Sequence, residues 1–273
     1  MLYLGLDGGG TGCRARLADA KGATLAEAQA GPANIASDFD AALANITRAI
    51  AGLSIPARAE VHAVLGLAGA NLSGAGPRLE AALPFRARVV QDVTTSVRGA
   101  LREADGIVAA IGTGSVFARQ IDGEIISTGG WGLRLGDEGS GAWIGHALVA
   151  LAARALDGRF ERTPLLNRLT HDLDGNAGLV AFSLRATPAD WAALAPQVFD
   201  TTDPAALAVL AAARAEIRAA IEHLQPQGAQ HPVVWLGGLG ARLAMDDWPR
   251  LAPRGTSLDG ALWIAMQEST WTD

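Results

Sequence analysis

The chain has 273 residues, a formal net charge of −6 and a single cysteine, Cys13. The excess of negative charge argues against nucleic acid or an anionic membrane as the main partner, and one cysteine excludes an internal disulfide or a metal site built from cysteines alone. The apolar start lacks the cationic region and long apolar run of a signal peptide, and charged residues interrupt every alanine-rich stretch. The composition therefore predicts a soluble cytoplasmic protein.

The first hundred residues predict a mixed sheet with helices on its faces. Residues 2–30 read as three strands joined by two turns. We then expect a helix over about 38–53, a buried strand over 60–68, a small-residue turn at 69–71, a short helix at 77–83 and a strand at 87–91. This order of strands and helices favours an α/β fold.

The same pattern then repeats. Strands are expected at 106–112, 115–120 and 124–128, followed by a long helix over about 141–156, further helices to residue 225, a strand at 232–236 and a last helix over about 258–267. An internal duplication of this kind indicates two related lobes. We expect an N-terminal lobe of residues 1–100 plus 258–273 and a C-terminal lobe of residues 101–257, with hinges near 97–106 and 254–258.

Two glycine-rich turns, each after an apolar strand, are the main functional signal. The first contains Gly9, Gly10 and Thr11, and the second is Gly112-Thr113-Gly114-Ser115. Both place backbone N–H groups and hydroxyls where they can surround an anion, although either turn alone could be a simple hairpin corner. Two such turns far apart in the sequence predict two lobes that grip one polyphosphate, which favours a nucleotide-dependent phosphotransferase.

Two aspartates follow predicted buried strands. Asp7 lies at the carboxyl end of the first strand, where ligand sites of α/β proteins gather, and could hold a hydrated Mg²⁺. Asp92 ends the strand at 87–91 and precedes a helix, so it suits the N-cap of that helix. Asp92 is also placed to act as a general base on an acceptor hydroxyl, and the two roles are compatible.

Residues 129–143 form a second candidate region, because they are too rich in glycine to be a core element. Trp131, Asp137 and Glu138 lie in this segment, and carboxylates beside a tryptophan face suit a sugar, although a plain loop before a helix has the same composition. Gly237 and Gly238 follow a late strand, where the backbone could approach an adenine or ribose or could merely allow close packing.

Taken together, these motifs resemble the actin-like ATPase superfamily of sugar kinases, heat-shock chaperones and actin. More narrowly, the chain resembles the BadF/BadG/BcrA/BcrD-type ATPase family, in its branch of N-acetylglucosamine kinases and bacterial glucosamine-specific kinases. The likeness spans essentially the whole chain, and residues 129–140 are its most specific block. Residues 13–16 and 31–35 look most similar to the glucosamine-specific members.

The resemblance implies a two-lobed fold of duplicated mixed sheets flanked by helices and an ATP- and Mg²⁺-dependent kinase acting on the 6-hydroxyl of an amino sugar. Asp92 would be the catalytic base and Asp7 would serve the metal, partly through water. The phosphates of ATP would lie on Gly9, Gly10, Thr11, Gly112, Thr113, Gly114 and Ser115, the adenosine on Gly237 and Gly238, and the sugar on Asn34, Gly130, Trp131 and Asp137. Gly12 departs from many relatives, which carry a phosphate-contacting side chain at this position, so the metal would neutralise more of the charge.

Several alternatives stay open or are excluded. Glucosamine is the preferred substrate, N-acetylglucosamine is the alternative, and a non-catalytic sugar-sensing regulator is more distant, because no DNA-binding helix pair precedes the first strand. Iron–sulfur ATPases that activate dehydratases need four thiolates per cluster, whereas a dimer of this chain offers two. Zinc-containing sugar kinases need a cysteine cluster that the chain lacks. Homodimerisation through alanine-rich helices is a further hypothesis.

Overall fold

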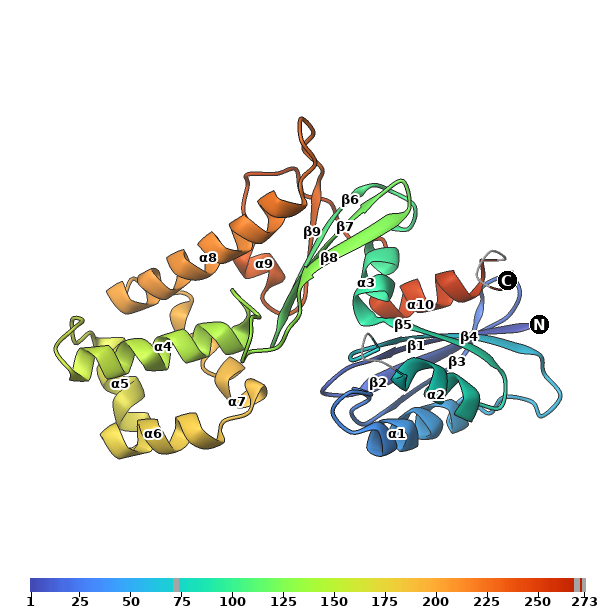
Figure 1. The fold of residues 1–273 in the computed structure, drawn as a ribbon, viewed down its shortest axis with the longest axis horizontal. Coiled ribbons are helices and arrows are strands. Elements are labelled where there is room, and N and C mark those ends of the chain that lie inside the picture. The colour runs from blue at the N-terminus through green and yellow to red at the C-terminus, as the bar shows by residue number, and fades with distance from the viewer. Residues whose placement is uncertain (71–73, 268–270, 272–273) are drawn as a thin grey trace. The chain divides into compact units, whose positions relative to one another are not determined.

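The computed structural model describes residues 1–70, 74–267 and 271 (Figure 1). The chain divides into two compact units. Unit 1 comprises Met1–Gly106, Gln120–Ile125 and Ala252–Asp273, and unit 2 comprises Ile107–Arg119 and Ile126–Leu251. The sequence-based division places residues 120–125 in the C-terminal lobe, whereas they group here with unit 1. The reason is Gln120, whose buried side-chain amide donates to the carbonyls of Arg102 and Ala104 at 2.9 and 2.8 Å.

Unit 1 is built on a five-stranded mixed sheet. Its strands are β1 (Leu2–Gly8), β2 (Cys13–Ala18), β3 (Thr24–Ala30), β4 (Val61–Leu67) and β5 (Arg86–Gln91), in the order β3-β2-β1-β4-β5. β1 is antiparallel to β2 and parallel to β4, and β4 is parallel to β5. The carboxyl ends of β1, β4 and β5 therefore meet at one edge of the sheet. The expected turn at 69–71 is described only as far as Ala70, and Asn71 lies outside the described residues.

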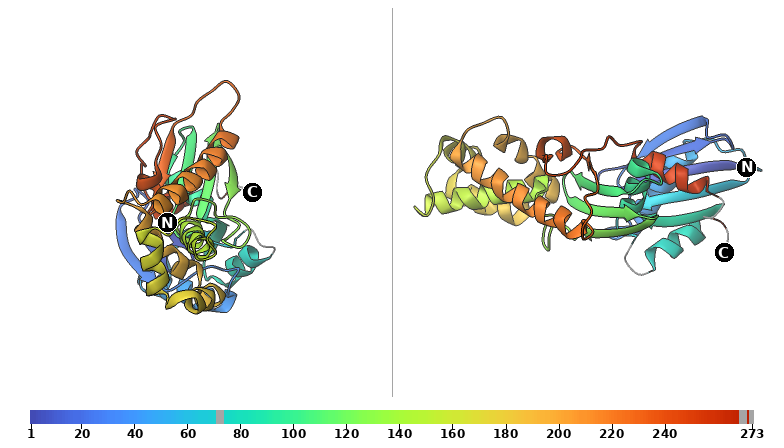
Figure 2. Two further views of the ribbon diagram at one scale, coloured as in Figure 1. Left: turned by 90° about the vertical axis from the view of Figure 1, so that its left-hand side faces the viewer. Right: turned by 90° about the horizontal axis from the view of Figure 1, so that it is seen from above.

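Helices cover both faces of this sheet. α1 (Phe39–Ala51) and α2 (Ala75–Ala82) lie on one face, and α3 (Asp92–Leu101) and α10 (Ser257–Ala265) lie on the other (Figures 1 and 2). α1 begins where the sequence predicts, because the Asp38 carboxylate accepts a hydrogen bond from the Ala41 N–H group and caps the helix. Its buried residue Ile46 packs with Leu4 and Leu65 of the sheet in one apolar core.

Unit 2 repeats the strand order of unit 1. β6 (Gly106–Ile111), β7 (Ser115–Ile121), β8 (Glu124–Gly129) and β9 (Val233–Leu236) form a sheet in the order β8-β7-β6-β9, which matches β3-β2-β1-β4. β6 and β9 are parallel, as β1 and β4 are. The duplication expected from the sequence is thus present in the pairing of the strands.

The remaining helices of unit 2 pack into one large apolar core with this sheet. They are α4 (Gly141–Leu156), α5 (Pro164–Asp172), α6 (Gly175–Arg185), α7 (Pro188–Ala192), a short 3₁₀ helix (Ala195–Val198), α8 (Pro204–Leu224) and α9 (Gly240–Leu243). α4 and α8 pack against each other, and Leu148 and Ile217 from these helices are fully buried. No helix within the described part of the chain has the length and apolar character needed to cross a membrane.

Three glycines let α10 approach the rest of unit 1 at backbone distance. A Cβ atom on Gly260 would lie 2.0 Å from the carbonyl oxygen of Thr95 in α3, and one on Gly99 would lie 2.0 Å from that of Thr256. A Cβ on Gly5 in β1 would lie 2.6 Å from the backbone nitrogen of Leu262. Since these neighbours are backbone atoms, a side chain could be accommodated only by moving whole helices. The position of α3 therefore depends on α10.

This packing gives a first prediction. Gly260→Ala should lower the midpoint of thermal unfolding by roughly 3–10 °C, because the steric cost of about 1–3 kcal/mol exceeds the gain in helix propensity. Gly76→Ala in α2 is the matched control, since its Cβ would meet only Val89 at 3.6 Å. The control should unfold at the same or a slightly higher temperature. A Gly260→Ala protein as stable as this control would contradict the close contact between α3 and α10.

Candidate active site

Backbone hydrogen bonds join three turns at the carboxyl edge of the sheet in unit 1. The carbonyl of Gly8 accepts from Ala68 N–H at 3.0 Å, and the carbonyl of Gly9 accepts from Ala33 N–H at 2.9 Å. Ile35 N–H donates to the Ala68 carbonyl at 3.2 Å. The first glycine turn, the loop containing Asn34 and the turn after β4 thus form one connected edge.

Asp7 and Asp92 are brought to this edge by the register of the strands. Asp7 pairs with Gly66, and Gly66 pairs with Val90, two residues before Asp92. Asp7 is therefore two strand spacings, about 10 Å, from the strand that leads to Asp92. The side chain of Asp7 is 19% exposed, and burial is the main cause that raises its pKa, with a smaller contribution from the charge of Asp92.

Asp92 is the first residue of α3, directly after the N-cap position of Gln91. Its Oδ1 accepts from Val93 N–H at 2.9 Å, and its carbonyl accepts from the hydroxyls of Thr95 and Ser96 at 2.9 Å each. Burial raises the pKa of this carboxyl, although the backbone N–H groups lower it in part. The predicted N-cap role of Asp92 is wrong by one residue, because Gln91 is the N-cap and Asp92 is already helical. The bond from Val93 N–H still orients the Asp92 carboxylate, which leaves it available for a chemical role.

Arg14 is a residue of this edge that the sequence analysis did not assign to the site. It pairs with Asp7 across β1 and β2, and its Nη2 lies 3.4 Å from Asp7 Oδ2. The guanidinium is 64% exposed, which leaves it in contact with solvent beside the glycine turn. The sequence could have pointed to Arg14, because side chains alternate along a strand and residues 12 and 14 therefore share a face. Since Gly12 has no side chain, Arg14 is the side chain that this face offers.

Asn34 uses its carboxamide oxygen within its own loop. Oδ1 accepts from the N–H groups of Ala36 and Ser37 at 2.9 and 3.2 Å. The Nδ2 group is then the part of Asn34 that can meet a ligand, as a donor. Gly10 and Thr11 are exposed at the neighbouring turn, and a Cβ on Gly9 or Gly10 would have no atom within 4 Å.

The second glycine turn is fixed to the start of α4 in unit 2. The carbonyls of Gly112 and Thr113 accept from Gly141 and Ala142 N–H at 2.8 and 3.0 Å. Thr113 is exposed, whereas the buried Ser115 hydroxyl donates to the carbonyl of Glu138 at 2.8 Å. Within this turn, Thr113 offers its hydroxyl to solvent and Ser115 holds the following loop.

That loop, residues 129–140, is closed by Asp137. This buried side chain accepts from Gly132 N–H at 3.1 Å, and a Cβ on Gly114 would lie 2.7 Å from its Oδ2. Burial raises the pKa of Asp137 despite hydrogen bonds from the backbone of Gly132 and Ser115. Trp131 is 71% exposed, and the exposed Gly130 precedes it in the same loop.

Gly237 and Gly238 follow β9 beside the second glycine turn. Gly237 has a positive φ of 82°, and a Cβ there would lie 2.3 Å from the carbonyl oxygen of Ile111 at the end of β6. Leu239 N–H donates to that same oxygen at 3.0 Å. A Cβ on Gly238 would have no atom within 4 Å, so its backbone is open to a ligand.

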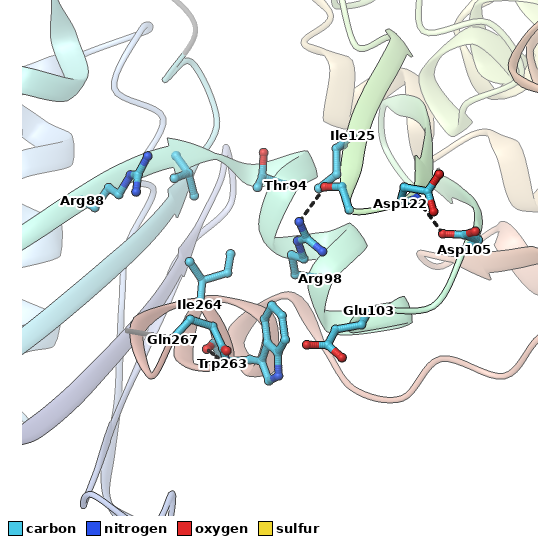
Figure 3. Close-up of a pocket in the computed structure, with 12 residues that line it drawn as sticks. Arg88, Thr94, Arg98, Glu103, Asp105, Asp122, Ile125, Trp263, Ile264 and Gln267 are labelled. Atoms are coloured by element: carbon cyan, nitrogen blue, oxygen red, sulfur yellow. Dashed lines mark hydrogen bonds between the residues drawn. The ribbon is translucent and has the colours of Figure 1, made fainter. Parts of the chain in front are cut away.

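Unit 1 also contains a separate pocket of about 750 Å³ (Figure 3). Arg98 from α3 donates to the carbonyl of Gly123 at 2.7 Å, and its guanidinium lies 5.7 Å from the ring centre of Trp263 in α10. None of the predicted site residues is among the twelve that line it, which are Arg88, Val90, Thr94, Arg98, Glu103, Asp105, Asp122, Gly123, Ile125, Trp263, Ile264 and Gln267.

The arrangement of glycine turns and carboxylates agrees with the comparison to known proteins. Residues 4–247 match the BadF/BadG/BcrA/BcrD ATPase family. The chain belongs to this family. Membership of the BadF/BadG/BcrA/BcrD family confirms the resemblance seen in the sequence and implies the use of ATP.

Three similar proteins each cover almost the whole of this BadF-type chain. The glucosamine kinase GspK of Vibrio cholerae is 32% identical over 96% of the chain and 95% of its own length. The crystal structure of a proposed N-acetylglucosamine kinase from Chromobacterium violaceum is 34% identical, with a TM-score of 0.83 over 97% of this chain and 99% of that one. A ROK-family glucokinase from Streptomyces griseus shares the fold at 16% identity and a TM-score of 0.54, over 96% of this chain and 98% of its own. The predicted α/β fold, with duplicated mixed sheets flanked by helices, is confirmed.

The raised pKa of Asp92 gives a prediction for stability. Because the folded pKa exceeds the unfolded value of about 4, the native state loses stability as the pH rises from the unfolded toward the folded pKa. Asp92→Asn should therefore unfold at a higher temperature than the wild type at pH 7, and this advantage should vanish below about pH 4.

Asp190→Asn is a control for which the expected change in stability has the opposite sign. Hydrogen bonds from Thr187 lower the pKa of Asp190, so this variant should be less stable than the wild type at pH 7. If Asp92→Asn were also less stable than the wild type at pH 7, this would contradict the prediction that the charged carboxylate of Asp92 destabilises the fold.

Proposed function

We propose that this protein is an ATP-dependent kinase that phosphorylates the 6-hydroxyl of an amino sugar, with glucosamine as the preferred substrate. The observation that carries the proposal is the half-buried carboxylate of Asp92, fixed at the same sheet edge as Asp7 and the first glycine turn. The similarity to the glucosamine kinase of Vibrio cholerae over 96% of the chain supports the class of substrate.

Asp92 is proposed as the general base. Its raised pKa favours uptake of a proton, and the hydrogen bond from Val93 N–H to Oδ1 orients the carboxylate. As the 6-oxygen of the sugar bonds to the γ-phosphorus of ATP, the bond from that phosphorus to the β,γ-bridging oxygen breaks. The hydroxyl proton passes to Asp92, and ADP and the sugar 6-phosphate leave. The chain needs mainly to position the groups and to neutralise charge.

The glycine turns are proposed to hold the phosphates of ATP. Gly9, Gly10 and Thr11 of unit 1 are accessible, as is Thr113 of unit 2 between Gly112 and Gly114. Backbone N–H groups in such turns favour negative charge. Ser115 supports the second turn through its bond to Glu138, and the open backbone at Gly238, directly after the closely packed Gly237, suits adenosine.

The residues at the edge of unit 1 fit a magnesium ion. Among the described residues, no cluster of three or more histidine, cysteine or acidic side chains could hold a metal by itself. A site of one carboxylate plus phosphate oxygens and water is what Mg²⁺ commonly uses. Asp7, whose charge is disfavoured by burial and by Asp92, would hold it; the ion would neutralise the phosphates, and Arg14 adds a second positive charge.

The sugar is proposed to lie against Trp131 and Gly130, with Asn34 as a hydrogen-bond donor. Asp137 belongs to the proposed sugar site because its side chain fixes the loop that carries Trp131 and Gly130. Unit 1 would thus supply the base and the first phosphate turn, and unit 2 the second turn, the sugar loop and the adenosine turn.

N-acetylglucosamine is the second candidate substrate, favoured by the similarity to the proposed N-acetylglucosamine kinase from Chromobacterium violaceum. A sugar-sensing regulator on the same fold would bind sugar without consuming ATP. Turnover in a coupled assay of ADP release, with glucosamine, N-acetylglucosamine, glucose and mannosamine, separates these cases. Homodimerisation through the helices of unit 2 stays an untested prediction.

Asp92→Asn should lower kcat by about 10²- to 10⁴-fold, because the asparagine cannot take the proton. Binding of ATP and sugar should stay close to that of the wild type in calorimetric titrations. Glu103→Gln is the control, since Glu103 lines the separate pocket of Figure 3 and should leave turnover unchanged. Turnover of Asp92→Asn at the wild-type rate would remove Asp92 from its role.

The pH dependence of kcat/KM gives an independent check. Asp92 acts only when deprotonated, so the rate should fall as the pH drops through its pKa. Because burial raises this pKa, the fall should begin at a higher pH than for an ordinary aspartate of about 4. An acid limb at or below pH 4 would show that another group is the base.

A further inference from the structure

The pocket of Figure 3 lies beside the helix that begins with Asp92, yet it shares no residue with the candidate active site. Its volume of about 750 Å³ is within the range of small-molecule sites, which measure about 300–1,000 Å³. It is lined by β5, by α3 and the loop after it, by α10 and the residues that follow it, and by the tip of the β7–β8 hairpin, all within unit 1. Thr94 and Arg98 are one turn apart on α3, so they share the face of α3 that borders the pocket. A molecule in this pocket would therefore contact the helix that carries Asp92.

Arg98 is a half-buried cation without a carboxylate partner. Its Nη2 donates to the carbonyl of Gly123 at 2.7 Å, and its Nη1 donates to that of Arg102 at 3.4 Å. Over the described residues 1–70, 74–267 and 271, no carboxylate oxygen lies within 4.0 Å of this guanidinium. Burial lowers the pKa of Arg98, and the charge of Glu103 offsets only part of this effect. An anion in the pocket would supply the counter-ion that the guanidinium lacks.

The side of the pocket formed by β5 and α3 is suited to an anion. Arg88 on β5 adds a second guanidinium to the lining, and Thr94 adds a hydroxyl. The guanidinium of Arg98 lies 5.7 Å from the ring centre of Trp263 in α10, so an aromatic surface borders the two cations. Guanidinium groups bind phosphate oxygens through charge-assisted hydrogen bonds, and hydroxyls donate to the same oxygens. This side therefore favours a phosphate group.

The opposite side of the pocket is acidic. Asp105 Oδ1 accepts a hydrogen bond from Asp122 N–H at 2.9 Å, which brings the two aspartates together at the end away from Arg88 (Figure 3). Asp122 has a positive φ of 49° in the turn that it forms with Gly123. Neither carboxylate forms an ion pair with a cationic side chain in the part of the chain that the structure describes. Two neighbouring carboxylates without a cation favour an ammonium group between them.

We propose that this pocket is a second binding site, and that it takes the amino-sugar phosphate that the proposed kinase reaction releases. The phosphate lies against Arg98 and Thr94, the ammonium group against Asp105 and Asp122, and the sugar ring against Trp263. A zwitterion complements both ends of the pocket, whereas a ligand of one sign meets like charge at one end. This inference rests on the proposed function for the identity of the ligand. Since α3 carries both the pocket and the proposed base, the bound product inhibits turnover from outside the active site.

Calorimetric titration of the full-length protein with glucosamine 6-phosphate tests the site, with saturating glucosamine present to occupy the sugar site. Asp105→Asn should weaken this binding about 10-fold or more, the effect of losing a hydrogen bond between charged groups. Asparagine can still accept from Asp122 N–H, so the turn is retained. The affinity for glucose 6-phosphate, which has no ammonium group, should not change in this variant.

Arg98→Gln is a second variant with a different expected pattern. Binding of glucosamine 6-phosphate and of glucose 6-phosphate should both weaken about 10-fold or more, because both ligands carry the phosphate. Asp157→Asn and Arg159→Gln, at exposed positions of unit 2, are the matched controls for the lost charges and should leave both affinities unchanged. Equal losses of the two ligands in Asp105→Asn, or no loss of either ligand in both variants, would overturn the assignment.

Initial rates show where the product acts. A product bound only at the sugar site competes with glucosamine, so a high concentration of glucosamine would abolish its inhibition. The second site predicts inhibition by glucosamine 6-phosphate that persists at saturating glucosamine and ATP and that is weaker in Asp105→Asn. Inhibition that glucosamine relieves completely in the wild type, or that is unchanged in Asp105→Asn, would contradict the proposal.

Failure of the kinase proposal is distinguishable from failure of this one. If the wild type phosphorylates none of the sugars, the kinase proposal fails, and the titrations still report on the pocket because they need no turnover. A selective loss of glucosamine 6-phosphate binding in Asp105→Asn would support the second site. Equal affinities of the wild type and Asp105→Asn for this ligand would contradict it.

Discussion

The backbone contact between α3 and α10 is the constraint on which the candidate site depends. Gly260 meets the carbonyl of Thr95, Gly99 meets that of Thr256, and the Ser96 and Ser257 hydroxyls are 2.9 Å apart. Because Asp92 begins α3, a helix from the end of the chain fixes the direction of a carboxylate more than 150 residues earlier, as their numbering shows. Close packing transmits position in this way, since a packed interior cannot be compressed to absorb an added side chain.

Charge at the edge of unit 1 does not serve the stability of the fold. Burial raises the pKa of Asp7 and of Asp92, and Arg14 offsets only part of this for Asp7. Two carboxylates with disfavoured charge cost free energy in the fold. In the proposed function, a bound cation and a transferred proton would each relieve that cost. The same edge carries accessible glycine backbone where phosphate oxygens can be held.

In unit 2, neighbouring side chains of the loop 129–140 differ in burial. Asp137 and Ser115 have polar groups turned inward, where they connect the loop to the second glycine turn. In the same loop, the side chain of Trp131 is exposed and that of Glu138 is half-buried. The adjacent residues Asp137 and Glu138 thus differ in burial, because Asp137 supports the loop from inside whereas the side chain of Glu138 is only half-buried.

The sequence by itself determined the fold class, the duplicated strand pattern and the family, because glycine turns and apolar strands are local signals that can be read directly from residue order. It also marked Asp7 and Asp92 as groups at strand ends. Only the tertiary structure decided that Arg14 faces Asp7, that residues 120–125 group with unit 1, and that Asp137 is buried while Glu138 is half-buried. Those outcomes depend on which side of a strand or loop is covered by distant residues, and burial of this kind is set by packing across the chain rather than by neighbours in sequence.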